Sequence, residues 1–288
     1  RVIPEDCRLP PQGDLLHRNK GRYNNLEDDT VWRENFWRYR PWKSLSSDEM
    51  VKMDLEMSVY AGMIDRMDQN IGRILDKLKE SDQMDNTLIM YLSDNGAEAQ
   101  DYNQSLDLPP GHPDSYRSMH VTWSGLSNTP FRQYKWFGLG GGCNTHFIAH
   151  WGNEIPGGLI TNQVGHVVDI APTILEAAGV NYPTTFEERP VEPLHGLSLL
   201  PVLKGGKREE PEWFISGMPN FRMYRERDWK ITRINNGEWM LFNLKNDYTE
   251  MNDVSADFPQ VYDQMISNFE QAKEQVDLFD IWDYRRKN

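Results

Sequence analysis

The stretch TLIMYLSDNG, Thr87–Gly96, joins a short apolar run to an abrupt polar end. An uninterrupted apolar run of this length predicts a strand, Leu88–Leu92, that is buried on both faces. Asp85 and Asn86 form a turn signal just before it. In open α/β sheets ligands bind beyond the carboxyl ends of the strands, so Asp94–Asn95 is expected to lie where a ligand binds.

A long helix is predicted before this strand. Ser46–Glu49 supplies an N-cap residue and two acids for the first turn. Apolar residues then recur three or four positions apart. They are Tyr60, Met63, Ile64, Met67, Ile71, Ile74, Leu75 and Leu78. We expect this apolar stripe to pack against a sheet.

The rest of the chain predicts an α/β fold followed by a smaller subdomain. A short helix near 28–37, a long loop at 97–130, a strand at 147–151 and a helix at 167–179 are expected in the first part. From about residue 210 the pattern changes to short strand-like runs at 213–216, 223–224, 229–234 and 239–243, with a hairpin signal at 235–237. A helix over 258–273 follows them. The C-terminal part is therefore predicted to be a small subdomain with an antiparallel sheet and one helix.

Composition excludes several classes of protein. The 288 residues carry 31 Lys and Arg against 44 Asp and Glu, a formal charge of -13, which argues against nucleic acid as the main partner. No run approaches the ~20 apolar residues of a membrane span, and no signal peptide is recognised at the start of the sequence. The two cysteines, Cys7 and Cys143, form one disulfide at most and have no zinc-site spacing.

Two segments are candidates for chemistry. Asp94 and Asn95 offer hard oxygen ligands that suit Ca²⁺ or Mg²⁺, although an Asp-Asn-Gly sequence is also common in plain turns. Lys135 precedes the glycine run Gly140–Gly142 and could stabilise an oxyanion, although a solvated surface lysine is the simpler interpretation. In the long loop, His112 and His120 are considered as residues that rim a substrate cleft.

Several stretches, in this order, resemble the sulfatase family of the alkaline-phosphatase-like superfamily. They are 60–75, 85–96, 127–135, 148–151, 169–175, 195–201, 228–230 and 241–244. The resemblance implies a partial alkaline-phosphatase-like mixed sheet flanked by helices over 1–205, which would be the C-terminal part of the catalytic domain, and the small α+β subdomain over 206–288. It also implies that Asp94 and Asn95 are ligands of a divalent cation, usually Ca²⁺, and that Lys135 is catalytic, on a sulfate oxygen or the bridging oxygen.

The sequence departs from the family pattern in two ways. The family nucleophile is a formylglycine made within a Cys/Ser-x-Pro/Ala-x-Arg signature, and no Cys or Ser of this chain fits it. We therefore expect the chain to lack the N-terminal portion that bears the formylglycine, and to be inactive alone. Near the lysine, Gly140 stands where the family commonly has an acidic residue. Leu139, Cys143 and His146 also depart from the common residues.

The leading hypothesis is a sulfuric ester hydrolase of arylsulfatase type, acting on a sulfated small molecule or glycan. One alternative is a phosphoester or phosphonate hydrolase of the same superfamily. Another is a non-catalytic sulfatase remnant that binds a sulfated glycan or a partner chain. By resemblance the protein is expected to be periplasmic or extracellular, while the natural substrate and the oligomeric state stay open.

Overall fold

The computed structural model describes residues 42–99, 103–209, 211–218, 221–234 and 237–276. The helix predicted near 28–37 lies outside these residues. By its packing the chain divides into two compact units, each described here by itself. Unit 1 holds Asp68–Asp94 and His146–Glu212, and unit 2 holds the described parts of 2–67, 95–145 and 213–288. The linear boundary predicted near residue 205 stays a prediction.

The predicted long helix is α2, Ser47–Glu80, which follows a short η3 turn at Trp42–Ser44. A capping box begins it: the Ser46 backbone N–H donates to Glu49 Oε2 at 2.8 Å, and the Glu49 N–H donates to Ser46 Oγ at 3.4 Å. The prediction that its apolar stripe is buried is wrong, because Met63 is 65% exposed and Ile74 is 62% exposed. Ile64 and Met67 of the stripe are exposed as well, whereas Tyr60, Ile71, Leu75 and Leu78 are half-buried.

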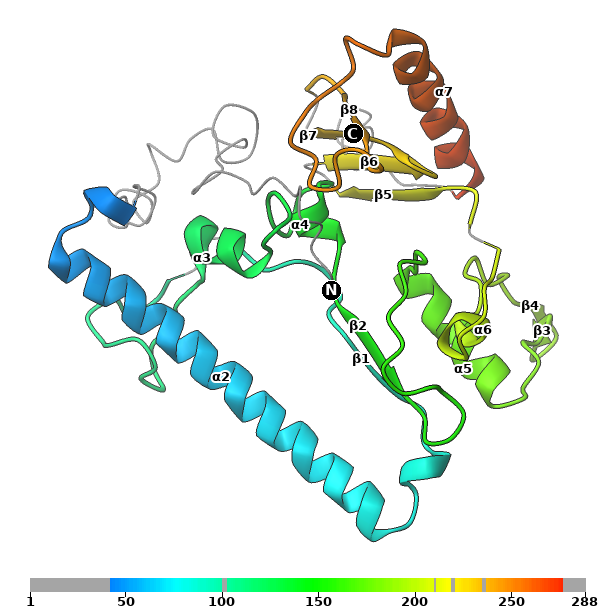
Figure 1. The fold of residues 1–288 in the computed structure, drawn as a ribbon, viewed down its shortest axis with the longest axis horizontal. Coiled ribbons are helices and arrows are strands. Elements are labelled where there is room, and N and C mark those ends of the chain that lie inside the picture. The colour runs from blue at the N-terminus through cyan, green and yellow to red at the C-terminus, as the bar shows by residue number, and fades with distance from the viewer. Residues whose placement is uncertain (1–41, 100–102, 210, 219–220, 235–236, 277–288) are drawn as a thin grey trace. The chain divides into compact units, whose positions relative to one another are not determined.

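Unit 1 contains the strand predicted over Leu88–Leu92. After the η4 turn, Met84–Asn86, strand β1, Ile89–Leu92, pairs antiparallel with β2, Phe147–His150, in a two-stranded sheet (Figure 1). The strand was expected to be buried on both faces, and this is wrong, since every residue of β1 is only half-buried. The apolar run still forms a strand because extended backbone needs a pairing partner, and β2 supplies one.

The remainder of unit 1 is helical and loop-rich. It contains η5 (Val167–Asp169), α5 (Ile170–Ala177), β3 (Thr185–Phe186), β4 (Arg189–Pro190) and α6 (Leu200–Leu203). The helix predicted over 167–179 is therefore confirmed as η5 continued by α5. β3 and β4 form a small antiparallel pair.

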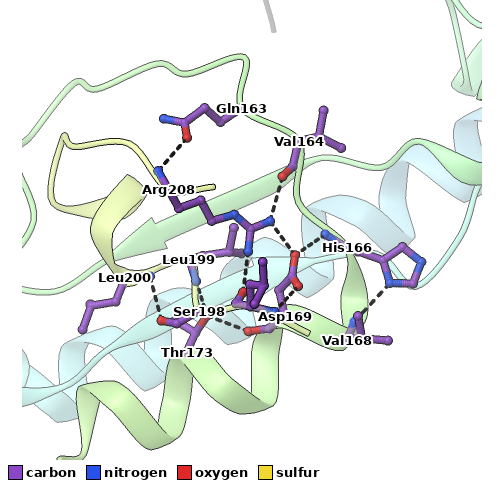
Figure 2. Close-up of polar contacts among 11 residues, drawn as sticks. Gln163, Val164, His166, Val168, Asp169, Thr173, Ser198, Leu199, Leu200 and Arg208 are labelled. Atoms are coloured by element: carbon purple, nitrogen blue, oxygen red, sulfur yellow. Dashed lines mark hydrogen bonds and ion pairs between the residues drawn. The ribbon is translucent and has the colours of Figure 1, made fainter. Parts of the chain in front are cut away.

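A buried carboxylate, Asp169, ties the loops of unit 1 together (Figure 2). Its Oδ2 accepts from Arg208 Nη2 and from the His166 backbone N–H, both at 2.8 Å, and its Oδ1 accepts from the Leu197 N–H at 2.9 Å. Thr173 Oγ1 donates to the Asp169 carbonyl at 2.6 Å and accepts from the Leu199 N–H at 2.8 Å. These bonds fasten the segment before α6 to the start of α5.

In unit 2 the predicted C-terminal sheet is confirmed. Strands β5 (Phe214–Met218), β6 (Phe221–Glu226), β7 (Trp229–Ile234) and β8 (Met240–Asn243) follow one another in an antiparallel sheet of order β5-β6-β7-β8. Helix α7, Pro259–Gln275, covers one face (Figure 1). Its apolar residues join Ile231 and Leu241 in one buried cluster.

Unit 2 also contains two short helices. Helix α3, His120–Ser127, lies inside the region predicted as a long loop, and α4, Gly140–Cys143, is made by the glycine run. The prediction of an unbroken loop over 97–130 is therefore wrong at its C-terminal end. Trp123 on α3 donates from Nε1 to the Met53 carbonyl of α2 at 3.2 Å, which anchors this segment.

Candidate functional site

Asp94 is the first of the predicted site residues along the chain, and it is the last residue of the Asp68–Asp94 segment of unit 1. It lies two residues beyond the end of β1, and its side chain is exposed. Within the described residues its carboxylate makes no hydrogen bond or ion pair. A charged oxygen pair at a strand end without a protein partner is available to a cation.

Asn95 is half-buried and is the first residue of the Asn95–Thr145 segment of unit 2. The residue after it has to be glycine. The Gly96 backbone N–H donates to the Gly142 carbonyl at 3.1 Å, and a Cβ on Gly96 would overlap the Gly141 carbonyl. The close approach of two backbone segments, and not a left-handed turn, therefore requires this glycine. It brings the segment after Asn95 against the glycine run.

Lys135 lies on a loop that is bound to this same segment. Its backbone N–H donates to the Ala97 carbonyl at 3.0 Å, and its Nζ lies 3.3 Å from Glu98 Oε2. The lysine side chain is 39% exposed, so its ammonium group reaches solvent. The loop also contains the non-glycine residues Gln133 and Trp136 at φ of 63° and 77°, a strained arrangement that is concentrated around Lys135.

A residue that the sequence argument did not single out holds this loop in place. Asn128 Oδ1 accepts from the Ala97 backbone N–H at 3.1 Å, and its Nδ2 donates to the Gln133 carbonyl at 3.0 Å. An amide side chain can make this pair of hydrogen bonds to the main chain because it has both a donor and an acceptor. In the sequence, the one feature that could have pointed to Asn128 was its position in the sulfatase-like stretch 127–135.

The glycine run is packed too closely for larger residues. A Cβ on Gly141 would overlap the carbonyls of Arg132 and Gln133, and one on Gly142 would overlap that of Phe137. Cys143, at the end of α4, donates from Sγ to the Phe137 carbonyl at 3.5 Å, and burial raises the pKa of its thiol. A protonated, buried thiol is a poor nucleophile.

The two loop histidines do not form a cleft rim together. His120 is fully buried at the start of α3, with Nε2 3.6 Å from Glu56 Oε2 of α2, so its predicted role at a cleft rim is wrong. His112 is more exposed. Its Nδ1 accepts from the Asp114 backbone N–H at 3.1 Å and lies 3.9 Å from Asp114 Oδ2. The sequence around the two histidines cannot distinguish these environments, because the burial of His120 depends on its packing against α2, which is distant in sequence.

The donor set at the strand end fits a hard cation but is incomplete. Among the described residues there is no group of three or more His, Cys, Asp or Glu side chains placed to hold a metal ion. Ca²⁺ takes about six to eight oxygen ligands. Asp94 and Asn95 would therefore supply two donors of the right chemistry and only part of a coordination sphere.

The fold and these contacts describe an α/β protein in which a polar strand end leads into a segment held against a lysine loop and a glycine run. A family model for sulfatases matches residues 15–180, more than half of the chain. The chain belongs to the sulfatase family.

Individual sulfatases are moderately similar. An uncharacterized sulfatase of Schizosaccharomyces pombe is 29% identical over 248 residues, which are 79% of this chain and 45% of that protein. The arylsulfatase of Klebsiella aerogenes is 31% identical over 174 residues, 56% of this chain and 37% of the enzyme. The chain thus spans less than half the length of each.

Solved structures share the fold. Ps i-CgsB in complex with k-i-k-neocarrahexaose is 25% identical with a TM-score of 0.56, and the match covers 74% of this chain and 42% of that one. BT4656, solved with D-glucosamine-2-N,6-O-disulfate, is 20% identical with a TM-score of 0.54 over 93% and 52% of the two chains. The expected alkaline-phosphatase-like α/β fold is confirmed. Among the described residues, no helix has the length and apolar character needed to cross a membrane.

Proposed function

We propose that the protein is a sulfuric ester hydrolase of arylsulfatase type. The observation that carries the proposal is the attachment of the Lys135 loop to the segment after Asn95, through the Lys135 N–H bond to Ala97 and the ion pair with Glu98. Membership of the sulfatase family supports sulfate esters as the substrate class.

In this proposal the strand end and the loop act on the same anionic group. Asp94 and Asn95 would be two ligands of Ca²⁺ or Mg²⁺, and when bound such a cation supplies Lewis-acid polarisation of a sulfuryl oxygen. The ammonium group of Lys135 binds a sulfate oxygen, or the bridging oxygen on which negative charge develops as the ester bond breaks. In the absence of the anion the ammonium group pairs with Glu98, which competes with the sulfate for it.

The proposed nucleophile is a formylglycine. The 288 residues contain no Cys/Ser-x-Pro/Ala-x-Arg sequence, and the buried Cys143 thiol does not replace it. The 288 residues are therefore proposed to supply two cation ligands and the lysine but not the nucleophile. By themselves they are expected to show no sulfatase turnover.

A sulfated glycan is the proposed natural substrate. Ps i-CgsB, at 25% identity, forms a complex with k-i-k-neocarrahexaose. The N-acetylgalactosamine-6-sulfatase of Canis lupus familiaris is 30% identical over 159 residues, 55% of this chain and 26% of that enzyme. Both support carbohydrate as the group that carries the sulfate.

The test compares hydrolysis of 4-nitrophenyl sulfate and 4-nitrophenyl phosphate by the protein encoded by the complete gene, with Ca²⁺, with Mg²⁺ and with a chelator. We expect 4-nitrophenyl sulfate to be the better substrate and the chelator to stop its hydrolysis. Mutation of a residue that hydrogen-bonds to a metal ligand commonly lowers metal affinity or activity by about 10–100-fold. Removal of a ligand should cost more, so Asp94→Ala is expected to lower the rate by about 100-fold or more and to weaken Ca²⁺ binding. A preference for the phosphate would favour a phosphoesterase, and sulfate binding without hydrolysis would favour a non-catalytic protein.

A further inference from the structure

The C-terminal sheet has a second face, opposite α7, that contacts the candidate site. Because side chains alternate along a strand, Ile231 packs in the cluster with α7 while its neighbours Lys230 and Thr232 point to the other side. On that side the sheet touches the segment after Lys135. A Cβ on Gly138 would overlap Thr232 Oγ1 and lie 3.0 Å from Met223 Cβ.

A buried ion pair occupies this second face. Lys230 Nζ lies 2.6 Å from Glu250 Oε1, and the two side chains are 5% and 1% exposed. The other carboxylate oxygen, Oε2, accepts a hydrogen bond from the Gly140 backbone N–H. The backbone carbonyl of Glu250 accepts from Arg132 Nη1 at 3.1 Å. Glu250 thus binds both ends of the loop that carries Lys135.

These bonds continue to the residues of the candidate site. The Gly141 N–H donates to the Arg132 carbonyl at 2.8 Å, and the Gly142 carbonyl accepts from the Gly96 N–H next to Asn95. Space at the junction is limited, since a Cβ on Gly140 would lie 2.8 Å from Glu250 Oε2. A shift of the carboxylate would therefore move the glycine run, and with it the loop and the segment after Asn95.

We propose that Glu250, neutralised by Lys230, is a positioning residue for Lys135, so that the face of the C-terminal sheet opposite α7 supports the sulfate-binding loop. This inference rests on the proposed function. A buried ion pair often stabilises no more than apolar side chains of similar volume, so stability alone does not account for its presence. The carboxylate accepts a hydrogen bond from the Gly140 N–H, which an apolar side chain cannot do.

The experiment uses the protein encoded by the complete gene, because the 288 residues are not expected to hydrolyse sulfate esters by themselves. Two double variants of it are compared that differ in this hydrogen bond. Lys230→Met with Glu250→Met removes both charges and the acceptor, whereas Lys230→Met with Glu250→Gln keeps a neutral acceptor for the Gly140 N–H. Ile231→Ala is the matched control, because it weakens the same strand on the face toward α7. The readouts are kcat and KM for 4-nitrophenyl sulfate, the Kd for inorganic sulfate, and amide hydrogen exchange at Gly140–Gly142.

We expect the Met/Met variant to lose about tenfold or more in kcat and in sulfate affinity, as supporting residues of a site commonly do, with faster exchange at Gly140–Gly142. The Met/Gln variant should remain within about threefold of the unchanged protein, because a neutral acceptor retains most of a hydrogen bond's geometry. Ile231→Ala should lower the unfolding temperature but retain kcat, sulfate affinity and slow exchange. The proposal is overturned if Met/Met and Met/Gln behave alike, or if Ile231→Ala reproduces the loss.

The proposed function can fail separately. If the unchanged protein neither hydrolyses the sulfate ester nor binds sulfate, the hydrolase assignment is wrong. Hydrogen exchange then still decides the structural link: selective loss of protection at Gly140–Gly142 in the Met/Met variant supports it, and unchanged protection overturns it.

Discussion

Two buried ion pairs, one in each compact unit, are alike in burial and differ in what surrounds them. Asp169 and Arg208 in unit 1 lie 2.8 Å apart with side chains 1% and 5% exposed, and Glu250 and Lys230 in unit 2 lie 2.6 Å apart with the same two values. By distance and exposure alone, these pairs cannot be distinguished.

Their remaining hydrogen bonds separate them. Asp169 accepts bonds from His166 and Leu197, and Arg208 donates to the Val164 carbonyl at 2.8 Å, all within the loops around α5 (Figure 2). Glu250 instead accepts from Gly140, beside the lysine loop. The hydrogen bonds of the first pair thus stay among the loops of its unit, whereas those of the second reach the glycine run, and we propose a positioning role for the second pair only.

The largest expected effect comes from breaking the unit 1 pair. Asp169→Ala leaves the Arg208 charge buried and removes the acceptors of two backbone N–H groups, those of His166 and Leu197, so it should lower the free energy of unfolding by about 3–5 kcal/mol. Urea unfolding measures the change. Lys204→Met, which breaks the exposed pair with Glu154, should cost at most about 1 kcal/mol. Equal effects of the two variants would contradict a special role for Asp169.

The next effect tests whether the unit 2 loop holds the anion. Lys135→Ala should weaken binding of inorganic sulfate and lower kcat by about 10²-fold, the usual loss for one donor to a developing charge. Isothermal titration and the 4-nitrophenyl sulfate assay measure these quantities. The unfolding temperature should stay nearly unchanged, because the lysine side chain is 39% exposed. Unchanged sulfate affinity would remove Lys135 from the site.

A smaller effect is expected from the partner of that lysine. Glu98→Gln removes the carboxylate 3.3 Å from Lys135 Nζ, which competes with an anion for the same ammonium group. Exposed pairs contribute about 0.2–1 kcal/mol, so sulfate should bind up to about fivefold more tightly. Weaker binding by the variant would indicate that Glu98 chiefly holds Lys135 in position.

The smallest effect concerns pH and unit 1. Burial lowers the pKa of His166 below its usual 6.5, against the opposing charge of Asp169, and neutral His166 Nδ1 accepts from the Val168 N–H at 3.3 Å. The unfolded chain therefore binds more protons below pH 6.5, and this part of the stability, complete above pH 6.5, is lost as the pH falls below it. His166→Asn should flatten the pH dependence of urea unfolding below pH 6.5. An equally steep dependence in the variant would assign it to other groups.

Much of the fold could be predicted because the signals were local. The apolar run at Leu88–Leu92, the capping residues at Ser46–Glu49 and the alternating runs of the C-terminal sheet each specify backbone conformation over a few residues. Burial was predicted less well, as Met63 and Ile74 on α2 are exposed. Periodicity states that a helix has an apolar face but does not identify what covers that face.

The sequence by itself determined the strand-end Asp94 and Asn95, the lysine before a glycine run, and the order of stretches typical of a sulfatase. Only the tertiary structure decided that Glu250, more than a hundred residues further on, binds Gly140, and that Asn128 fastens Ala97 to the lysine loop. The physical reason is that local backbone preferences act over a few neighbouring residues. A buried carboxylate instead takes its partners from whichever donors the packed chain brings within about 3 Å.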